Sequence, residues 1–181
     1  MKNKNIIGIM ALALVIAVGA CPAFAAQTAS TTQQVQVTVN PTIAIAATWE
    51  NAGNNSLINL GSRDADGLQT TFAGGASGEQ LYTYSNVPID VYTKASGDLT
   101  SGTNTIALSN FLYKDSTGTN EQTAFTQTYA KIHENWPAAT QSGPNVDSVD
   151  LALTVPFGTA SGNYASTVYF SAVQAGQAGP L

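Results

Sequence analysis

The last third of the chain alternates between apolar and polar residues, and this alternation constrains the fold more than any other feature. Residues 149–155 place valine or leucine at every second position, with Asp, Ala and Thr between them. The alternation returns at Tyr164 and continues to Phe170, after a connection rich in proline and glycine. A period of two is typical of a strand with one buried face. Two such runs joined by a Pro/Gly-rich loop predict an antiparallel β-hairpin.

The first 25 residues, 1–25, are typical of a secretory signal peptide. Two lysines precede an apolar run at 6–20, which is shorter than the ~20 residues of a membrane-spanning helix. Ala23-Phe24-Ala25 offers the small residues of a cleavage site. We expect export and cleavage after Ala25. Retention of the segment as a membrane anchor is the alternative.

Cys21 is the only cysteine in the chain, and it allows a different processing. Residues 18–21 resemble a lipoprotein box, in which Cys21 would be lipidated and become the new N-terminus. Cleavage after Ala25 instead removes it. The mature chain then has neither disulfides nor thiolate metal ligands, so its stability comes from packing and hydrogen bonds.

The composition of residues 26–181 suits one secreted domain. Its 156 residues are enough for a sizeable core. Four basic and eleven acidic residues remain, a formal net charge of −7. This balance argues against nucleic acid and anionic membrane surfaces, which require basic patches. The membrane is then involved only through export. The abundant uncharged polar residues indicate a solvated sheet face or a surface that packs against copies of itself.

Strand patterns dominate the mature chain. No segment after Ala26 has a helical period over ten or more residues. Short segments with strand character recur instead, at 33–40, 43–45, 57–60, 81–84, 87–94, 106–108, 111–113 and 125–131. The segment 43–45 continues the phase of 33–40, so with the two C-terminal runs these segments predict about eight or nine strands. The fold class is therefore all-β, an antiparallel β-sandwich whose two sheets share one core about 10 Å thick.

Pro41 separates an N-terminal segment from the predicted sandwich. Val35, Val37 and Val39 lie on one face of an alternating run that ends just before it. Proline cannot donate to a β-ladder, so a central strand rarely continues through it. We therefore predict an N-terminal leader with a separate strand at 26–40 and a sandwich domain at 41–181. The separate strand would reach another sheet or another subunit. A bent first strand that switches sheets within the domain is the alternative.

Candidate catalytic residues lack the partners that catalysis needs. His133 is the only histidine, and we predict it to be a surface loop residue. Neither a Gly-x-Ser-x-Gly elbow nor a mature cysteine supports nucleophilic catalysis. Glycoside hydrolysis needs paired carboxylates, and nothing pairs any two of the candidates Glu50, Glu79, Glu121 and Glu134. We expect no enzymatic activity and no cofactor.

Metal binding is weakly indicated. Residues 64–67 read Asp-Ala-Asp-Gly and match the centre of a calcium loop, but Ala73 stands where the bidentate glutamate should be. A plain Asp-Gly turn is the favoured interpretation. Asp147 and Asp150 are further candidate ligands with little support. The sequence therefore predicts no metal site.

Two tryptophans and one short motif complete the candidates. Trp49 is in phase with the preceding apolar positions and is predicted to lie in the core. Trp136 precedes Pro137 and is predicted to be exposed, where it would suit an aromatic platform for sugars. Asn54-Asn55-Ser56 matches the N-linked acceptor pattern within a turn. Asn54 is thus a candidate glycosylation site.

Two stretches carry a family resemblance. One spans 87–110, and the other spans 151–170 with a strand, Val-Pro, a Gly-Asn-Tyr turn and a closing strand. They resemble secreted archaeal surface proteins with an immunoglobulin-like sandwich. The second stretch is also similar to the end of fimbrial-type and spore-coat-U-type subunits. The chain also resembles, more loosely, the TasA-like matrix fibres of bacteria and the bundling pili of archaea. The resemblance implies an immunoglobulin-like topology, with a jelly-roll type as the alternative.

The resemblance also implies a function. In such fibres an N-terminal strand of one subunit completes the sheet of the next, which is donor-strand complementation. Val35, Val37 and Val39 would be the donor residues here, and copies of the chain would be the partners. The expected protein is a structural subunit of an extracellular pilus or biofilm-matrix fibre. The alternative is a monomeric cell-surface adhesion or carbohydrate-binding module whose partners are cell-surface glycans.

Overall fold

The computed structural model describes residues 31–115 and 121–181. The predicted signal peptide, Cys21 and the first residues of the leader lie outside them. The chain divides into one unit that ends at Thr38 and a second unit, Val39–Leu181. All of the named strands belong to the second unit.

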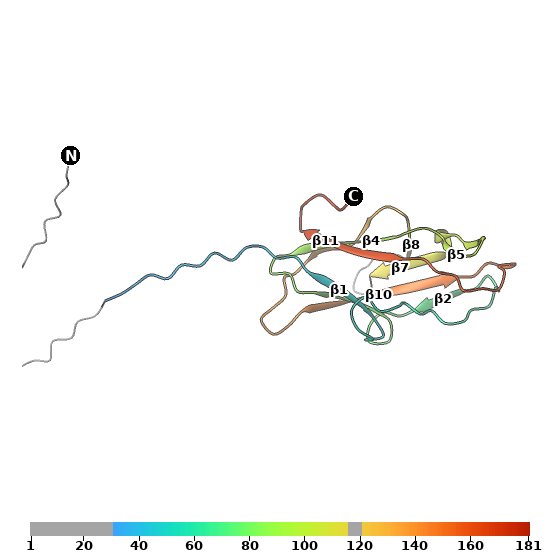
Figure 1. The fold of residues 1–181 in the computed structure, drawn as a ribbon, viewed down its shortest axis with the longest axis horizontal. Coiled ribbons are helices and arrows are strands. Elements are labelled where there is room, and N and C mark those ends of the chain that lie inside the picture. Colours follow the sequence, from blue (N-terminus) through green and yellow to red (C-terminus); the bar gives the residue numbers. More distant parts are fainter. Residues whose placement is uncertain (1–30, 116–120) are drawn as a thin grey trace, which may run out of the picture. The chain divides into compact units, whose positions relative to one another are not determined.

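The larger sheet has six antiparallel strands in the order β1-β3-β10-β7-β8, with β2 also paired to β10 (Figure 1). The long strand β10 is therefore central, and β1 is an end strand. The strands are β1 (Ile45–Trp49), β2 (Gln69–Phe72), β3 (Glu79–Thr83), β7 (Phe111–Asp115), β8 (Thr123–Ala124) and β10 (Asn145–Thr154).

The second sheet has three antiparallel strands in the order β11-β4-β9. They are β4 (Ile89–Ala95), β9 (Ala130–Trp136) and β11 (Val168–Gln174). A hairpin of β5 (Leu99–Ser101) and β6 (Asn104–Ile106) and the 3₁₀ turn η1 (Leu108–Asn110) follow β4. The predicted all-β antiparallel fold is confirmed. Within the described ranges no helix is long and apolar enough to span a membrane.

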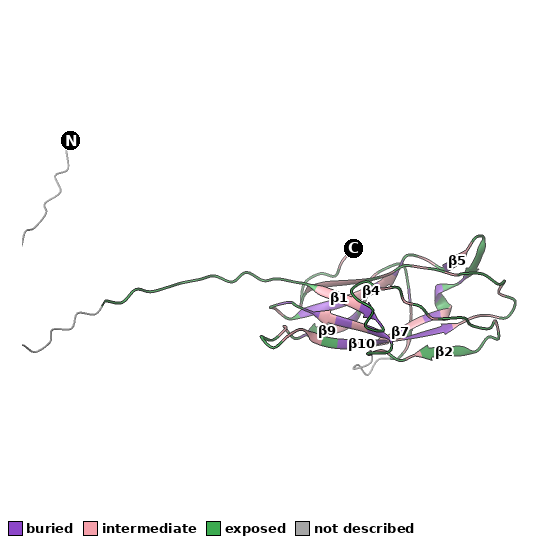
Figure 2. Cartoon of the chain, turned by 60° about the horizontal axis from the view of Figure 1, so that its bottom comes forward, coloured by how far each residue is buried: buried purple, intermediate pink, exposed green. Residues whose placement is uncertain are grey.

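The core lies between the two sheets because each contributes one apolar face. On β10, Val149 and Leu151 are buried, and on β4, Ile89 and Val91 are buried. These side chains belong to one cluster with residues of both sheets, and Figure 2 shows buried positions along β7, β9 and β10. Each such side chain contributes roughly 1.5–3 kcal/mol through burial. Alternation in the sequence thus gives each sheet one apolar face, and the two sheets pack with these faces together.

The predicted C-terminal hairpin is wrong. Strand β10 pairs with β2, β3 and β7, whereas β11 pairs with β4 in the other sheet. Hairpin loops usually hold two to five residues, but residues 155–167 separate these strands. The connection crosses between the sheets and is held midway, where Thr100 and Ala165 exchange backbone hydrogen bonds of 2.9 and 3.1 Å.

Other predicted strands differ in extent. The segments 31–44 and 57–60 contain no strand, and the strand expected at 125–131 is β9, which begins at Ala130. The described residues contain eleven strands rather than eight or nine. Several are short, because loops interrupt runs that the sequence pattern joins. Whether the topology is immunoglobulin-like or of jelly-roll type stays an expectation.

Strands β2 and β3 are an interrupted strand along one edge of β10. Both are antiparallel to β10, and residues 73–78 loop out between them. Gly74 N donates to Asp150 Oδ1 at 2.7 Å, which closes this loop. A Cβ atom on Gly74 would lie 2.7 Å from the backbone nitrogen of Val149, so only glycine fits. The loop places Glu79 at the start of β3, with its side chain on the inner face.

Candidate binding groove

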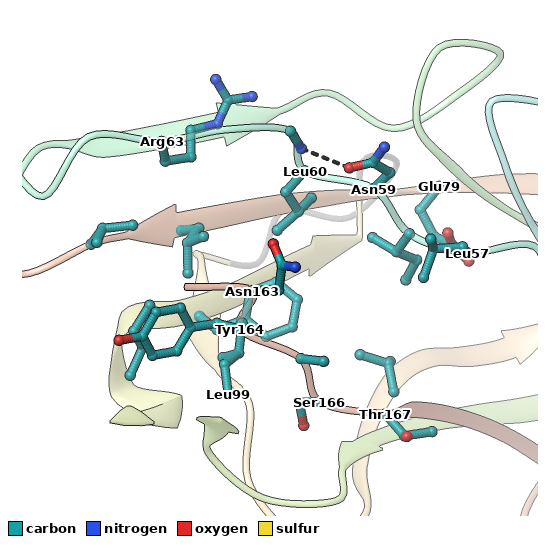
Figure 3. Close-up of a pocket in the computed structure, with 18 of the residues that line it drawn as sticks. Leu57, Asn59, Leu60, Arg63, Glu79, Leu99, Asn163, Tyr164, Ser166 and Thr167 are labelled. Carbon is teal, nitrogen blue, oxygen red and sulfur yellow. Dashed lines mark hydrogen bonds between the residues drawn. The ribbon is translucent and has the colours of Figure 1, made fainter. Parts of the chain in front are cut away.

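A groove of about 1180 Å³ opens between the two sheets beside β1. One wall consists of the start of β1 and residues 55–65, and the other consists of residues 159–170. In Figure 3 Leu60 and Asn163 face each other across this space, with Leu99 below them. Further lining residues are buried between the sheets: Glu79, Ile106, Phe111 and Leu153.

The groove is open because the strands beside it are end strands. Among the described strands, β1 pairs only with β3, and β11 pairs only with β4. The last part of β1 is covered, since Asn55 N donates to Ala47 O and Trp49 N donates to Ser56 Oγ, both at 2.7 Å. The part near Ile45 lines the groove. An unpaired strand edge is a template for another strand.

Hydrophobic residues make up just over half of the lining, and many of them are incompletely buried. Eight hydrophobic residues pack against the core while staying partly exposed: Ile45, Ala47, Ile58, Leu60, Val155, Tyr164, Val168 and Phe170. Pockets for small ligands usually measure about 300–1,000 Å³. This groove is larger and runs along strand edges, so an extended peptide segment fits its shape better than a small molecule does.

Glu79 gives the groove an unusual electrostatic character. It is 2 % exposed, and its Oε2 atom has no hydrogen-bond partner in the described structure. Burial raises the pKa of Glu79 to about 8, so its carboxyl is mostly neutral at pH 7. The other charged residues of the lining are Arg63 and Asp64. The Arg63 guanidinium lies 4.8 Å from the ring centroid of Phe72.

The predicted donor residues form no strand in the structure. Val35, Val37 and Val39 are 91, 82 and 74 % exposed. The sandwich unit holds the chain just after them through Asn86. Its Nδ2 donates to Asn40 O at 3.0 Å, and its Oδ1 accepts from Thr42 N at 2.7 Å. The role of the three valines as a donor strand stays a prediction.

A second cluster joins the sheets on the side where β7 and β9 meet. His133 on β9 is not the surface loop residue that the sequence predicted. Its Nδ1 lies 2.7 Å from Asp147 Oδ2 on β10 and 3.2 Å from Asp115 Oδ2 on β7. Both carboxylates are buried. The three ligand atoms lie within 4.8 Å of one another, so this trio is an arrangement that could hold a metal ion.

The electrostatics of this cluster favour an ionic interaction. The hydrogen bond to Asp147 is the main cause that raises the pKa of His133. Burial opposes ionisation of Asp147, but hydrogen bonds from His133 and from Ser148 N, which lies 2.7 Å from Oδ1, keep its pKa below its ordinary value. Sequence reasoning named Asp147 and missed Asp115. A signal for Asp147 existed, because it is in phase with the buried Val149 and Leu151.

The two tryptophans have similar burial. Trp49 is in the core, as predicted. The prediction for Trp136 is wrong, because it is 4 % exposed. Strand β9 continues to this residue, which pairs with Ile89, and its ring lies 5.3 Å from that of His133. Pro137 ends the strand but does not expose the residue before it.

The remaining candidates lie on turns. Asp66 Oδ1 accepts from Leu68 N at 2.9 Å, and Gly67 has a φ of 69°. This is the predicted Asp-Gly turn. Asp150 supports the loop of Gly74. Asn54 is exposed beside the end of β1, and its glycosylation stays a prediction.

Comparisons of the sequence with protein-family models and with curated proteins found no match. The functional argument therefore depends on the groove and on the residues around it.

Proposed function

We propose that the protein is a secreted structural subunit of an extracellular filament, in which residues 33–40 of one copy fill the groove of another. One observation carries this proposal. The sandwich is open along an apolar groove between end strands β1 and β11, and the same chain carries an alternating valine segment that forms no strand. The groove has strand edges without a neighbouring strand, and the segment has a strand-like sequence without a sheet, so each supplies what the other lacks.

Insertion is favourable only if it buries apolar surface on both the inserted segment and the groove. Burial of three valine side chains contributes roughly 1.5–3 kcal/mol each. Ordering eight residues costs about 1–2 kcal/mol per residue. The valines alone therefore offset about half of this cost. The remainder must come from the partly exposed lining of the groove and from backbone hydrogen bonds to the strand edges.

Such a contact builds filaments rather than closed dimers. A segment of one copy would meet a groove of the next, so the two surfaces differ and the contact is heterologous. Pro41 supports the separation of donor and body, since it cannot continue a ladder. The hydrogen bonds of Asn86 mark where the body begins.

The residue on which the alternative function, glycan binding, mainly depended is not exposed. A monomeric glycan-binding module was expected to present Trp136 as a platform, and Trp136 is buried against His133. The filament subunit is thus the function that the geometry supports best.

Electron microscopy and sedimentation of the mature chain, residues 26–181, test the proposal. Changing Val35, Val37 and Val39 to aspartate should abolish filaments, because three charges would enter an apolar groove. The matched control places aspartate at 34, 36 and 38, on the other face of the same segment, and should still assemble. Filaments from the valine variant, or a wild-type chain that stays monomeric at every concentration, would contradict the proposal.

A further inference from the structure

Glu79 occupies a position where a carboxyl group is costly. It faces Trp49 of β1 and Val149 of β10 in the ladder, and it shares the inner face of β3 with Leu81 and Thr83, which are also buried. An unsatisfied buried polar group costs about 1–3 kcal/mol. An apolar side chain of similar volume would avoid this cost in the isolated subunit.

The chain itself supplies no hydrogen bond to Glu79 Oε2 among the residues described. Burial alone accounts for the raised pKa of its carboxyl. In Figure 3 Glu79 lies beside Leu57, and the Arg63 guanidinium points away from it. Trp49 Nε1 is a second buried atom without a partner, but Trp49 does not line the groove.

We propose that Glu79 is the polar anchor of the groove, and that its carboxyl hydrogen-bonds an amide of the polypeptide segment that inserts there from a second copy of the chain. This inference depends on the proposed function and adds to it how the groove selects the segment that inserts. Trp49 and Val149, which face Glu79 in the ladder, and Leu81 on the same face of β3 are apolar, so a segment is selected both by its valine face and by an amide that reaches Glu79. The neutral carboxyl has one donor and one acceptor, as does a backbone amide.

The anchor predicts opposite effects on stability and on binding. In the isolated subunit Glu79→Leu removes the unsatisfied carboxyl and should raise the melting temperature. The same change should weaken insertion about tenfold, which corresponds to about 1.4 kcal/mol for one lost hydrogen bond. Glu79→Gln keeps one donor and one acceptor, so it should bind like the wild type. A residue with a merely structural role would not separate the two measurements in this way.

The experiment uses the full mature chain with the three valine-to-aspartate changes, which cannot supply its own donor. A fluorescent peptide with the sequence of residues 31–40 is the probe, and fluorescence anisotropy gives its Kd. We expect wild-type affinity with Glu79→Gln, about tenfold weaker binding with Glu79→Leu, and no change with Trp49→Phe.

The outcomes separate the two proposals. Equal affinity of the Glu79→Leu and Glu79 chains would overturn the anchor while peptide binding itself supports the groove. Weakening by Trp49→Phe equal to that of Glu79→Leu would overturn it too, because Glu79 would then act through Trp49 of its own chain. A peptide that binds none of the chains would overturn both the anchor and the proposed function.

Discussion

The two sides of the sandwich are closed in different ways. Where β7 and β10 meet β9, His133 lies between two buried carboxylates and ties the sheets together. Where β1 and β11 end the two sheets, a groove remains open, and its buried carboxyl on Glu79 has an oxygen without a partner in the described part of the chain. Both sides bury acidic groups, but among the described residues only the first side places a cation within ion-pair distance of them.

This difference indicates which side is finished within one chain. A buried polar group is tolerated when it is hydrogen-bonded, and a buried charge when it is also paired; both are costly otherwise. The His133 side meets this condition with residues from three strands. The Glu79 side does not, so its partner is expected to come from outside the chain. Three predictions follow the comparison from the largest expected effect to the smallest.

The closed side should depend strongly on Asp147. Asp147→Ala would remove the closer partner of His133 and leave its ring with Asp115 alone, and we expect a loss of up to about 3 kcal/mol, the cost of losing a hydrogen bond to a charged group. Calorimetry should show a lower melting temperature by roughly 2–4 °C per kcal/mol. Asp66→Ala is the control, because Asp66 is exposed and accepts one turn hydrogen bond. Equal loss from both variants would remove the distinction between the two sides.

The strands were predictable where one face is buried. Val149, Leu151 and Leu153 alternate in the sequence and are buried in the structure, because a period of two decides which side chains face the core. The pairing of these strands was not predictable in the same way. Alternation is the same whichever partner a strand takes, so the two C-terminal runs were joined as a hairpin although they belong to different sheets.

The sites were less predictable than the strands. Asp115, His133 and Asp147 are far apart in the sequence and meet only because β7, β9 and β10 pack together. The groove likewise depends on which strands end each sheet. A signal for Glu79 was present, since it is in phase with Leu81 at the start of a strand. A glutamate on the buried face of a strand is unusual, so it indicates a candidate functional site once the strand is known.

The open side should make stability depend on pH through Glu79. Burial raises its pKa from 4.5 to about 8, so the folded chain retains a proton that the unfolded chain releases. Stability should therefore be greatest below about pH 4.5 and fall as the pH rises to about 8, by a few kcal/mol in total. Glu79→Gln should remove this fall. Chemical denaturation at pH 4.5, 6 and 8 measures it in the assembly-deficient full chain. Parallel pH profiles for both chains would show that Glu79 is solvated and that the open side carries no penalty.

The closed side should give a smaller pH effect, visible once Glu79 no longer titrates. The hydrogen bond to Asp147 raises the pKa of His133 above its ordinary value of 6.5, so its contribution is complete below that pH and is lost as the pH rises through the raised value. The groups facing its ring are Asp115 of β7, Asp147 of β10 and Trp136 of its own strand. In the Glu79→Gln chain, adding His133→Gln should lower stability by about 1–2 kcal/mol at pH 6 and by less at pH 9. A deficit that stays constant from pH 6 to pH 9 would mean that His133 acts through packing against Trp136 instead. The closed side would then be held by shape, and charge would no longer distinguish it from the groove.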